Sequence, residues 1–350
     1  MTRFKIAVYP GDGIGGEVAE QGIRVLQAIE ASSELEFELR EFPWGIEYYR
    51  QHGELVPSDF LTQLRSFDAI FLGAVGWPAE MADHLTLEPL VKIRQAFDQY
   101  ACVRPAKLFP GVPSVLAGKG PEDIDLVVVR ENSEGEYINV GGRFKMGTPA
   151  EHAIQTGIHS RRGVERVLRY GFELARTRRS RLTMATKSNA LRFSYVMWDE
   201  ILEEIKPDYP DVVADRQHCD ALAMNFVRCP ESFDVVVASN LFGDLLTDLG
   251  GVIGGGLGLA PSANINPERT FPSMFEPVHG SAPDIAGQGI SNPVAAILSV
   301  AMMLKHLGQQ SQSERIETAV ESALLEGSKT RDLGGSLSTQ EMAAAVIANL

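Results

Sequence analysis

The acidic residues Asp244 and Asp248 are the first candidates for chemistry, because they lie four residues apart in Asn240-Leu-Phe-Gly-Asp-Leu-Leu-Thr-Asp248. Leucines in this segment recur at helical spacing, so both carboxylates are predicted to share one helix face. Like charges at this spacing repel by roughly a few tenths of a kcal/mol. A divalent cation held by the carboxylate oxygens would relieve the repulsion. In the simpler alternative, Asp244 complements the positive end of the helix dipole and Asp248 is solvated.

The surroundings of this acidic pair favour a ligand site. The preceding apolar run, Phe233-Asp-Val-Val-Val-Ala238, is typical of a buried parallel strand. Ligands of α/β proteins bind at the carboxyl ends of such strands. Asp220, which opens another predicted helix, is a third acid that could complete a metal shell, although it could also be an ordinary helix N-terminal acid.

Three arginines at or near the ends of predicted core elements indicate an anionic ligand. Arg94 lies in a predicted helix, Arg104 precedes a proline that favours extended backbone, and Arg130 ends the buried strand Asp125-Leu-Val-Val-Val-Arg130. A lone arginine in such a place is usually part of a surface ion pair. Three of them fit a carboxylate-bearing ligand better, because the guanidinium fork matches a carboxylate.

Lys187 and two glycine-containing loops are further candidates. Lys187 follows a predicted strand at the expected start of a helix, where a cation is electrostatically unfavourable; it is either functional or a surface lysine. The turn Pro10-Gly-Asp-Gly-Ile-Gly-Gly16 lacks the G-x-G-x-x-G spacing and the downstream acid of a Rossmann site, so we interpret it as a tight turn. The loop Glu276-Pro-Val-His-Gly-Ser-Ala-Pro-Asp-Ile-Ala-Gly287 is rigid, and its exposed backbone donors suit a bound nucleotide.

Composition bounds the class of protein. The 350 residues have a net charge of −14 and 44% hydrophobic residues, which indicates a globular chain without nucleic-acid or anionic membrane partners. The three cysteines have no metal-binding spacing and suit the reducing cytoplasm. No signal peptide is recognised, and the longest apolar stretch, from Val294 to Leu304, is too short to span a bilayer.

The motifs together resemble the β-decarboxylating dehydrogenases of 2-hydroxy acids, the family of isocitrate and 3-isopropylmalate dehydrogenases. The resemblance runs from Ile6 to about Leu307, and within the family it is strongest to the decarboxylating D-malate and tartrate type. Its motifs are Gly11-Asp-Gly-Ile-Gly15, Arg94 with Arg104, Arg130-Glu-Asn with Tyr137, Thr186-Lys-Ser-Asn189, Asp220, the Asn240–Asp248 segment and His279-Gly-Ser-Ala-Pro-Asp284.

This resemblance implies an α/β fold with a large mixed sheet, which is not a Rossmann fold. Residues 1–99 and 255–350 would form a large cofactor-binding domain, and residues 100–254 a small domain for dimerisation and the metal site. The polar excursion at about 141–160 would be an arm that interlocks two subunits. Because such an arm alternates polar and apolar residues, pairing with a partner strand explains it better than a free loop.

The resemblance also implies oxidative decarboxylation of a (2R)-2-hydroxy diacid, D-malate to pyruvate and CO₂ or tartrate, with NAD reduction. Arg94, Arg104 and Arg130 would bind the substrate, Lys187 would be the general base, and Tyr137 would protonate C3. Mn²⁺ or Mg²⁺ would bind Asp244 and Asp248 with Asp220 of the other subunit, so the homodimer would share its active sites; K⁺ is a candidate additional cation. The implied cofactor-binding residues are His279, Gly280, Ser281, Ala282, Asp284, Asn292 and Asn189.

The segment His84–Arg94 is expected to read the group on C3 of the substrate. It is about one residue shorter than in the malate and tartrate type, and its Leu90 and Val91 offer no partner for a third carboxylate, which disfavours isocitrate. Isopropylmalate enzymes resemble this chain in having apolar residues there, but they usually lack the Arg130-Glu-Asn132 triplet. 3-Isopropylmalate dehydrogenase, a non-catalytic homologue and a metal-free Rossmann oxidoreductase are the alternatives.

Overall fold

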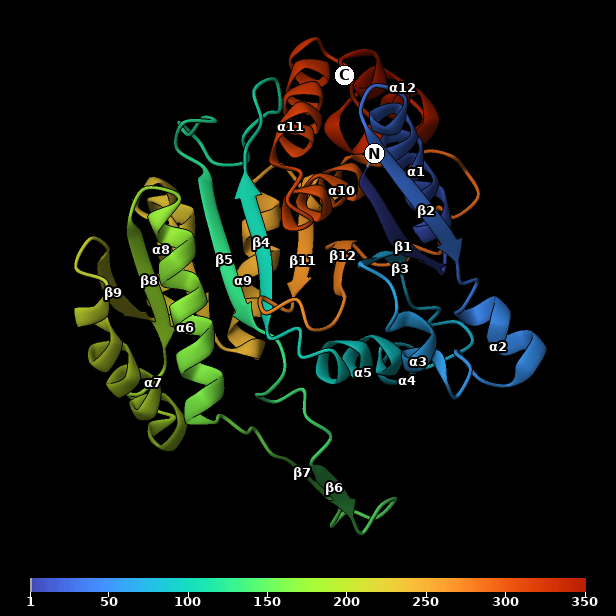
Figure 1. The fold of residues 1–350 in the computed structure, drawn as a ribbon. Helices are drawn as coiled ribbons and strands as arrows, with labels where there is room; N and C mark the ends of the chain where they lie inside the picture. Colours follow the sequence, from blue (N-terminus) through green and yellow to red (C-terminus); the bar gives the residue numbers. More distant parts are fainter. Residues whose placement is uncertain (1) are drawn as a thin grey trace.

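The computed structural model describes residues 2–350, whose strands form a ten-stranded mixed sheet in the order β2-β1-β3-β12-β11-β4-β5-β10-β8-β9 (Figure 1). A separate two-stranded sheet is formed by β6 and β7. The predicted α/β fold with a large mixed sheet is therefore confirmed. One half of the large sheet contains β1 (Thr2–Gly11), β2 (Leu35–Glu41), β3 (Ala69–Ala74), β11 (Pro261–Ile265) and β12 (Ser273–Pro277). The other contains β4 (Ala101–Lys107), β5 (Asp125–Glu131), β8 (Arg181–Thr186), β9 (Val213–His218) and β10 (Val235–Ala238).

The two halves of the sheet meet where β11 pairs with β4. β11 runs antiparallel to both neighbours, β12 and β4, and β4 runs antiparallel to β5. The outer strands pair in parallel, including β10 with β5 and β8, as the apolar run at 233–238 predicts. The junction separates strands of residues 1–99 and 255–350 from strands of residues 100–254. The division into two domains at those bounds stays a prediction, because the sheet itself is continuous.

Helices cover both faces of the sheet. In Figure 1, α6 (Arg161–Arg176) and α10 (Val294–His306) lie in front of the strands, and α9 (Asn240–Ile253) lies behind them. Successive side chains of a strand point to opposite faces of the sheet, so neighbouring residues of one strand can line pockets on different faces. The remaining α-helices are α1 (Gly15–Ala31), α2 (Ile46–His52), α3 (Phe60–Leu64), α4 (Asp83–Thr86), α5 (Glu88–Ala96), α7 (Arg192–Ile205), α8 (Cys219–Arg228), α11 (Gln310–Leu325) and α12 (Thr339–Ala348).

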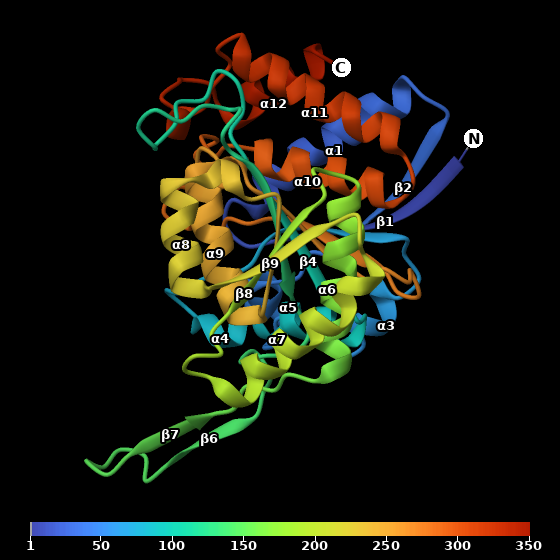
Figure 2. The same ribbon diagram turned by 90° about the vertical axis from the view of Figure 1, so that its left-hand side faces the viewer.

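The predicted excursion at 141–160 is a hairpin that projects from the body of the molecule (Figure 2). Its strands, β6 (Gly141–Phe144) and β7 (His152–Gln155), pair with each other in antiparallel register. The two strands of the hairpin therefore pair within one chain, and the predicted pairing of this arm with a strand of a second subunit stays a prediction. All residues of both strands are exposed. We refer to residues 141–155 as the arm.

The helix expected to begin at Lys187 begins later. A turn occupies the residues after β8, and α7 starts at Arg192. Lys187 therefore lies in a strand-to-helix connection, and its ammonium is not placed at a helix N-terminus. Asp220, by contrast, lies in the first turn of α8 as predicted. Across residues 2–350, no helix combines the length and apolar character needed to cross a membrane.

Candidate active site

The three predicted arginines line one pocket of about 170 Å³. Arg94 comes from the last turn of α5, Arg104 from β4 and Arg130 from the carboxyl end of β5. All three are buried. Burial of three guanidinium groups is costly unless acceptors compensate them, so their partners define what the pocket can bind. The pocket is also lined by Tyr137, Asp244, Glu276 and His279.

Asp244 is the acceptor that two of these arginines share. Arg104 donates from Nη1 to Asp244 Oδ1 at 3.3 Å and to Thr247 Oγ1 at 2.7 Å, and its Nε donates to Ser262 Oγ at 3.3 Å. Arg130 also donates to Asp244 Oδ1. Burial opposes ionisation of Asp244, but the charges of Arg130 and Arg104 outweigh it, so the pKa of this carboxyl lies below its ordinary value. Asp244 is therefore a carboxylate at neutral pH.

Tyr137 completes the surroundings of this carboxylate. Its hydroxyl donates to Asp244 Oδ2 at 2.7 Å, and its ring lies 4.9 Å from the guanidinium carbon of Arg130. Burial, followed by the hydrogen bond to Asp244, raises the pKa of Tyr137. The phenol keeps its proton at neutral pH and can donate it to a group in the pocket.

Arg94 is held by Glu276, an acid that the sequence motifs do not single out. Its Nη2 lies 2.8 Å from Glu276 Oε1, which also accepts from Asn264 Nδ2 at 2.7 Å. Arg94 Nε has no hydrogen-bond partner among residues 2–350. Because Glu276 satisfies only part of the guanidinium, an anion in the pocket could still bind Arg94.

The residues missed by sequence reasoning lie on the same sheet face as Arg104. Glu276 is on β12, directly before Pro277, and Ser262 and Asn264 are two residues apart on β11. The available signals were an acid inside a buried strand and the alternation of polar residues in Ser262-Ala-Asn264. Leu87 and Leu90 line the pocket, whereas the predicted Val91 does not.

The predicted metal and base residues form two separate groups within one chain. Asp248 lies one helical turn after Asp244 on α9. Burial and the neighbouring charge of Asp244 raise the pKa of Asp248. Asp220 instead accepts from Lys187 Nζ at 2.7 Å. Within residues 2–350 of one chain, no group of three or more His, Cys, Asp or Glu residues is arranged to hold a metal ion.

The predicted cofactor loop follows β12 and packs against the glycine-rich turn at 11–16. Ile14 N donates to Ser281 O at 2.8 Å, and a Cβ on Gly13 would lie only 2.0 Å from that oxygen. The glycine is thus required for close approach of two backbones, in agreement with its interpretation as a structural turn. Ala282 has a positive φ of 38°, so the loop also carries backbone strain.

The predicted cofactor residues differ in their surroundings. His279 lines the arginine pocket, and its buried Nε2 has no partner among residues 2–350. Gly280 follows it, and Asp284 is exposed. Asn292 is buried, donates to Asp332 Oδ2 at 3.0 Å and accepts from Val294 N at the start of α10. Asn189 is exposed in the turn after Lys187.

The chain matches the isocitrate/isopropylmalate dehydrogenase family over residues 5–346. It is 52% identical to the decarboxylating D-malate dehydrogenase of Escherichia coli (strain K12), over 99% of this chain and 98% of that protein. It is 51% identical to the tartrate dehydrogenase/decarboxylase of Pseudomonas putida, over 98% of this chain and 96% of that protein. The crystal structure of isocitrate dehydrogenase from Methylococcus capsulatus superposes with a TM-score of 0.88 at 36% identity, covering 99% of both chains.

The fold is that of a decarboxylating dehydrogenase rather than a Rossmann oxidoreductase. The chain belongs to the isocitrate/isopropylmalate dehydrogenase family. The resemblance predicted from the motifs is confirmed, including the similarity to D-malate and tartrate dehydrogenases. Family membership implies dependence on a nicotinamide cofactor and a divalent metal ion.

Proposed function

We propose that this chain catalyses the NAD-dependent oxidative decarboxylation of D-malate to pyruvate and CO₂, with tartrate as a further substrate. The observation that carries the proposal is the pocket in which Arg94, Arg104 and Arg130 surround Asp244 and Tyr137. The similarity to a D-malate dehydrogenase and a tartrate dehydrogenase supports the choice of substrate class. The three free cysteines agree with a reducing compartment, and we propose the cytoplasm.

The arginines would bind the carboxylate that leaves as CO₂. In the structure Arg104 and Arg130 are occupied by Asp244. If Asp244 held a cation, part of this pairing would be released, and both guanidinium groups could turn to a substrate carboxylate. Arg94, anchored by Glu276, would hold the same carboxylate from the α5 side. Three fixed donors would orient the substrate for reaction at C2 and C3.

The acids of α9 fit a divalent metal ion. Two carboxylates one turn apart, one ionised among arginines and one with a raised pKa, supply hard oxygen ligands but not a full shell. Asp220 of a partner subunit would add the third carboxylate. When bound, Mn²⁺ or Mg²⁺ acidifies the substrate's 2-hydroxyl and stabilises the negative charge that follows loss of CO₂.

Lys187 and Tyr137 would move the protons. Lys187 of a partner subunit would accept the proton of the substrate's 2-hydroxyl, and Tyr137 would donate its proton to C3 after CO₂ has left. The raised pKa of Tyr137 supports its role as the donor. Lys187 and Asp220 are in contact at 2.7 Å. This contact supports the proposal that one subunit contributes both residues to the same active site of its partner.

A homodimer would bring these groups together. Apolar side chains are exposed along the adjoining helices α8 and α9, on which the three acids lie: Met224, Val227, Leu245 and Val252. The arm exposes Phe144, Met146 and Ile154. Exposed apolar residues gathered around incomplete acidic sites support burial against a second copy of the chain. We propose that α8, α9 and the arm form this interface.

NAD would lie on the loop after β12. When bound, NAD would supply the hydride acceptor of the reaction. His279, Ser281 and Ala282 hold the loop beside the arginine pocket, and the unpartnered Nε2 of His279 is available to a ligand. A Cβ added to Gly280 would meet no atom within 4 Å beyond the adjoining residues, so the loop surface there is open. The exposed carboxylate of Asp284 would accept from the adenosine ribose hydroxyls.

The kcat/KM values for D-malate, tartrate, 3-isopropylmalate and isocitrate test the proposal in one assay with NAD and Mn²⁺ or Mg²⁺. We expect D-malate to give the highest value and isocitrate the lowest. The apolar Leu87 and Leu90 on the pocket keep 3-isopropylmalate as the second candidate. A clear preference for 3-isopropylmalate would replace the proposed substrate, and no turnover of any diacid would favour a non-catalytic homologue.

A further inference from the structure

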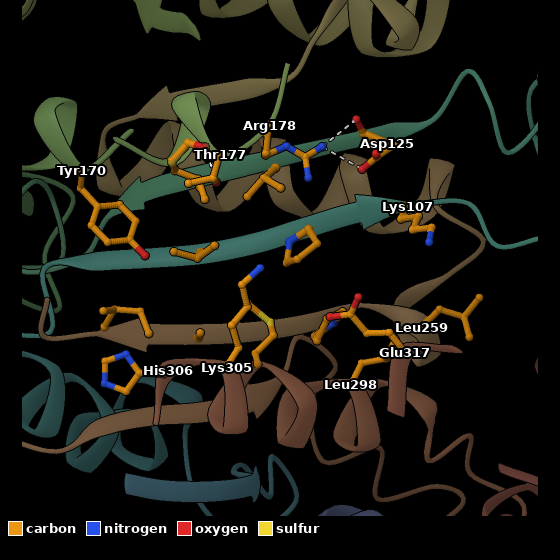
Figure 3. Close-up of a pocket in the computed structure, with 18 of the residues that line it drawn as sticks. Lys107, Asp125, Tyr170, Thr177, Arg178, Leu259, Leu298, Lys305, His306 and Glu317 are labelled. Carbon is orange, nitrogen blue, oxygen red and sulfur yellow. Dashed lines mark hydrogen bonds and ion pairs between the residues drawn. The ribbon is translucent and has the colours of Figure 1, made fainter. Parts of the chain in front are cut away.

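A second pocket lies on the opposite face of the same strands from the arginine pocket. Its volume is about 370 Å³, which falls within the range of small-molecule sites. Figure 3 shows its walls: Tyr170, Thr177 and Arg178 come from α6 and the turn after it, Leu298 and Lys305 come from α10, and strands pass between them. We call it the back pocket.

Strand alternation places the two pockets back to back. On β4, Val103 and Pro105 line the back pocket, whereas the intervening Arg104 lines the arginine pocket. On β11, Pro261, Ala263 and Ile265 line the back pocket, whereas Ser262 and Asn264 bond to the arginine pocket's Arg104 and Glu276. The two pockets therefore lie on opposite faces of a single layer of β-sheet, and no side chain lines both of them.

The floor and the charged rim of the back pocket select a ligand. The floor is apolar and is formed by side chains of β4, β5 and β11, including Val103, Val127 and Ala263. At the rim, Arg178 already pairs with Asp125 and Asp234 at 2.8 and 2.7 Å, and Lys107 pairs with Glu321 at 3.3 Å. These two cations are therefore largely compensated.

Lys305 is the cation of the rim that remains available. It is exposed, and it forms no ion pair with a carboxylate of residues 2–350. In Figure 3 its side chain points from α10 toward the strands. His306 beside it adds no charge at neutral pH, because burial and the charge of Arg269 lower its pKa to about 4. An anionic group above the apolar floor would pair with Lys305.

The acids of the lining limit the ligand to one negative charge. Asp125 is compensated by Arg178, but Glu317 also faces the back pocket and forms no ion pair within residues 2–350. A second carboxylate on the ligand would therefore meet the like charge of Glu317. This excludes the dianionic substrates that suit the arginine pocket. We propose that the back pocket binds an amphipathic monocarboxylate, with its apolar body on β4, β5 and β11 and its carboxylate on Lys305. This inference is independent of the proposed function.

Calorimetric titration with sodium octanoate tests the site. The purified protein is used in whatever oligomeric state it adopts. We expect saturable binding that weakens at least tenfold in Lys305→Met, which keeps the aliphatic stem but removes the charge. Lys206→Met is the matched control, because Lys206, on the η1 turn (Lys206–Asp208), does not line the back pocket and pairs with Glu203 at 3.2 Å. Octylamine, which has the opposite charge, should bind more weakly than octanoate.

Two further measurements locate the ligand. Met302→Trp fills the back pocket from α10 and should abolish octanoate binding while circular dichroism and turnover show that the enzyme remains folded. Saturating D-malate should leave octanoate binding in place, since the pockets are separate. Displacement of octanoate by D-malate, equal binding to Lys305→Met and wild type, or equal binding of octylamine would each overturn the proposal. So would the absence of octanoate binding at millimolar concentration.

Discussion

The ammonium of Lys187 and the carboxylate of Asp220 form an ion pair at 2.7 Å that joins the turn after β8 to the first turn of α8. The pair is partly open to solvent, with 27% of the Lys187 side chain and 65% of the Asp220 side chain exposed. Asp244 has different partners, Arg104, Arg130 and Tyr137. One chain therefore presents two separate groups: the candidate base Lys187 with the candidate metal ligand Asp220, and the candidate metal ligand Asp244 with its arginines. Neither group alone holds all the residues that the proposed reaction needs.

Asp248→Asn is expected to abolish metal-dependent turnover without unfolding the chain. The amide keeps the shape of the carboxylate but removes a charged oxygen ligand, and removal of the repulsion from Asp244 favours the folded state. We expect kcat to fall by about 100-fold or more, because both acidification of the hydroxyl and charge stabilisation depend on the ion. Asp59→Asn, at an exposed aspartate that bonds to Gln63, is the control. Turnover by Asp248→Asn at the wild-type rate in the presence of chelator would contradict the metal assignment.

NAD is expected to be preferred to NADP. The exposed Asp284 can accept hydrogen bonds from two ribose hydroxyls, but its charge would repel a 2′-phosphate. The ratio of kcat/KM values for the two cofactors measures the preference, and Asp284→Asn should reduce it because the repulsion is lost. A wild-type enzyme that uses NADP more efficiently than NAD would show that this loop has been misassigned.

The sheet and the arginine pocket were largely predictable from sequence, for physical reasons. Continuous apolar runs such as Val127–Val129 and Val235–Val237 can be buried on both faces only in an interior strand. Arginines in such buried strands must find acceptors, which is why Arg104 and Arg130 converge on Asp244. Helical spacing likewise placed Asp244 and Asp248 on one helix.

Other features depend on long-range packing and have no local sequence signal. Glu276 lies in a strand whose five residues are all buried, and its contacts with Arg94 at 2.8 Å and Asn264 at 2.7 Å across the fold explain the buried charge. The start of α7 at Arg192 rather than near Lys187 reflects a turn closed by Leu191 N and Lys187 O. The back pocket requires the antiparallel pairing of β11 with β4, which joins segments about 160 residues apart.

Leu90→Ala is expected to shift substrate preference toward a larger C3 group. Leu90 is buried on the arginine pocket, so its truncation makes room for an isopropyl substituent. The kcat/KM ratio of 3-isopropylmalate to D-malate should rise about tenfold or more, since tenfold is the lower end of the discrimination that one methylene group gives in an apolar pocket. Leu85→Ala, at an exposed leucine of α4, is the control and should leave the ratio unchanged. An unchanged ratio in Leu90→Ala would remove this residue from the specificity site.

His306→Gln is expected to reduce the loss of stability in acid. Burial and the charge of Arg269 lower the pKa of His306 from 6.5 to about 4. Above pH 6.5 the imidazole is neutral in both the folded and the unfolded chain. As pH falls from 6.5 toward 4, the unfolded chain binds a proton that the folded chain does not, so the free energy of unfolding falls by up to about 3 kcal/mol. Urea unfolding at pH 7 and pH 5 measures the effect, with His52→Gln as the exposed control. Equal acid sensitivity of His306→Gln and wild type would contradict it.

Mixed dimers test whether two chains build each active site. Lys187→Ala removes the base from one group, and Asp244→Asn removes a metal ligand from the other, so each variant alone is expected to be inactive. If the groups meet across the interface, a dimer with one chain of each kind has one site with both lesions and one intact site. Joint refolding should then recover up to about half of the wild-type activity per mixed dimer, as expected for an isologous pair of sites.

Two differently tagged chains allow the mixed dimers to be isolated before the assay. The control combines Lys187→Ala with Asp220→Asn, whose lesions lie in the same ion-paired group. Each site of that mixed dimer would keep one lesion, since each site takes Lys187 and Asp220 together from one chain, so no activity should return. Recovery in the first mixture but not in the second would therefore identify both the shared site and the membership of its two groups. Purified mixed dimers of Lys187→Ala with Asp244→Asn that remain inactive would rule out the shared site.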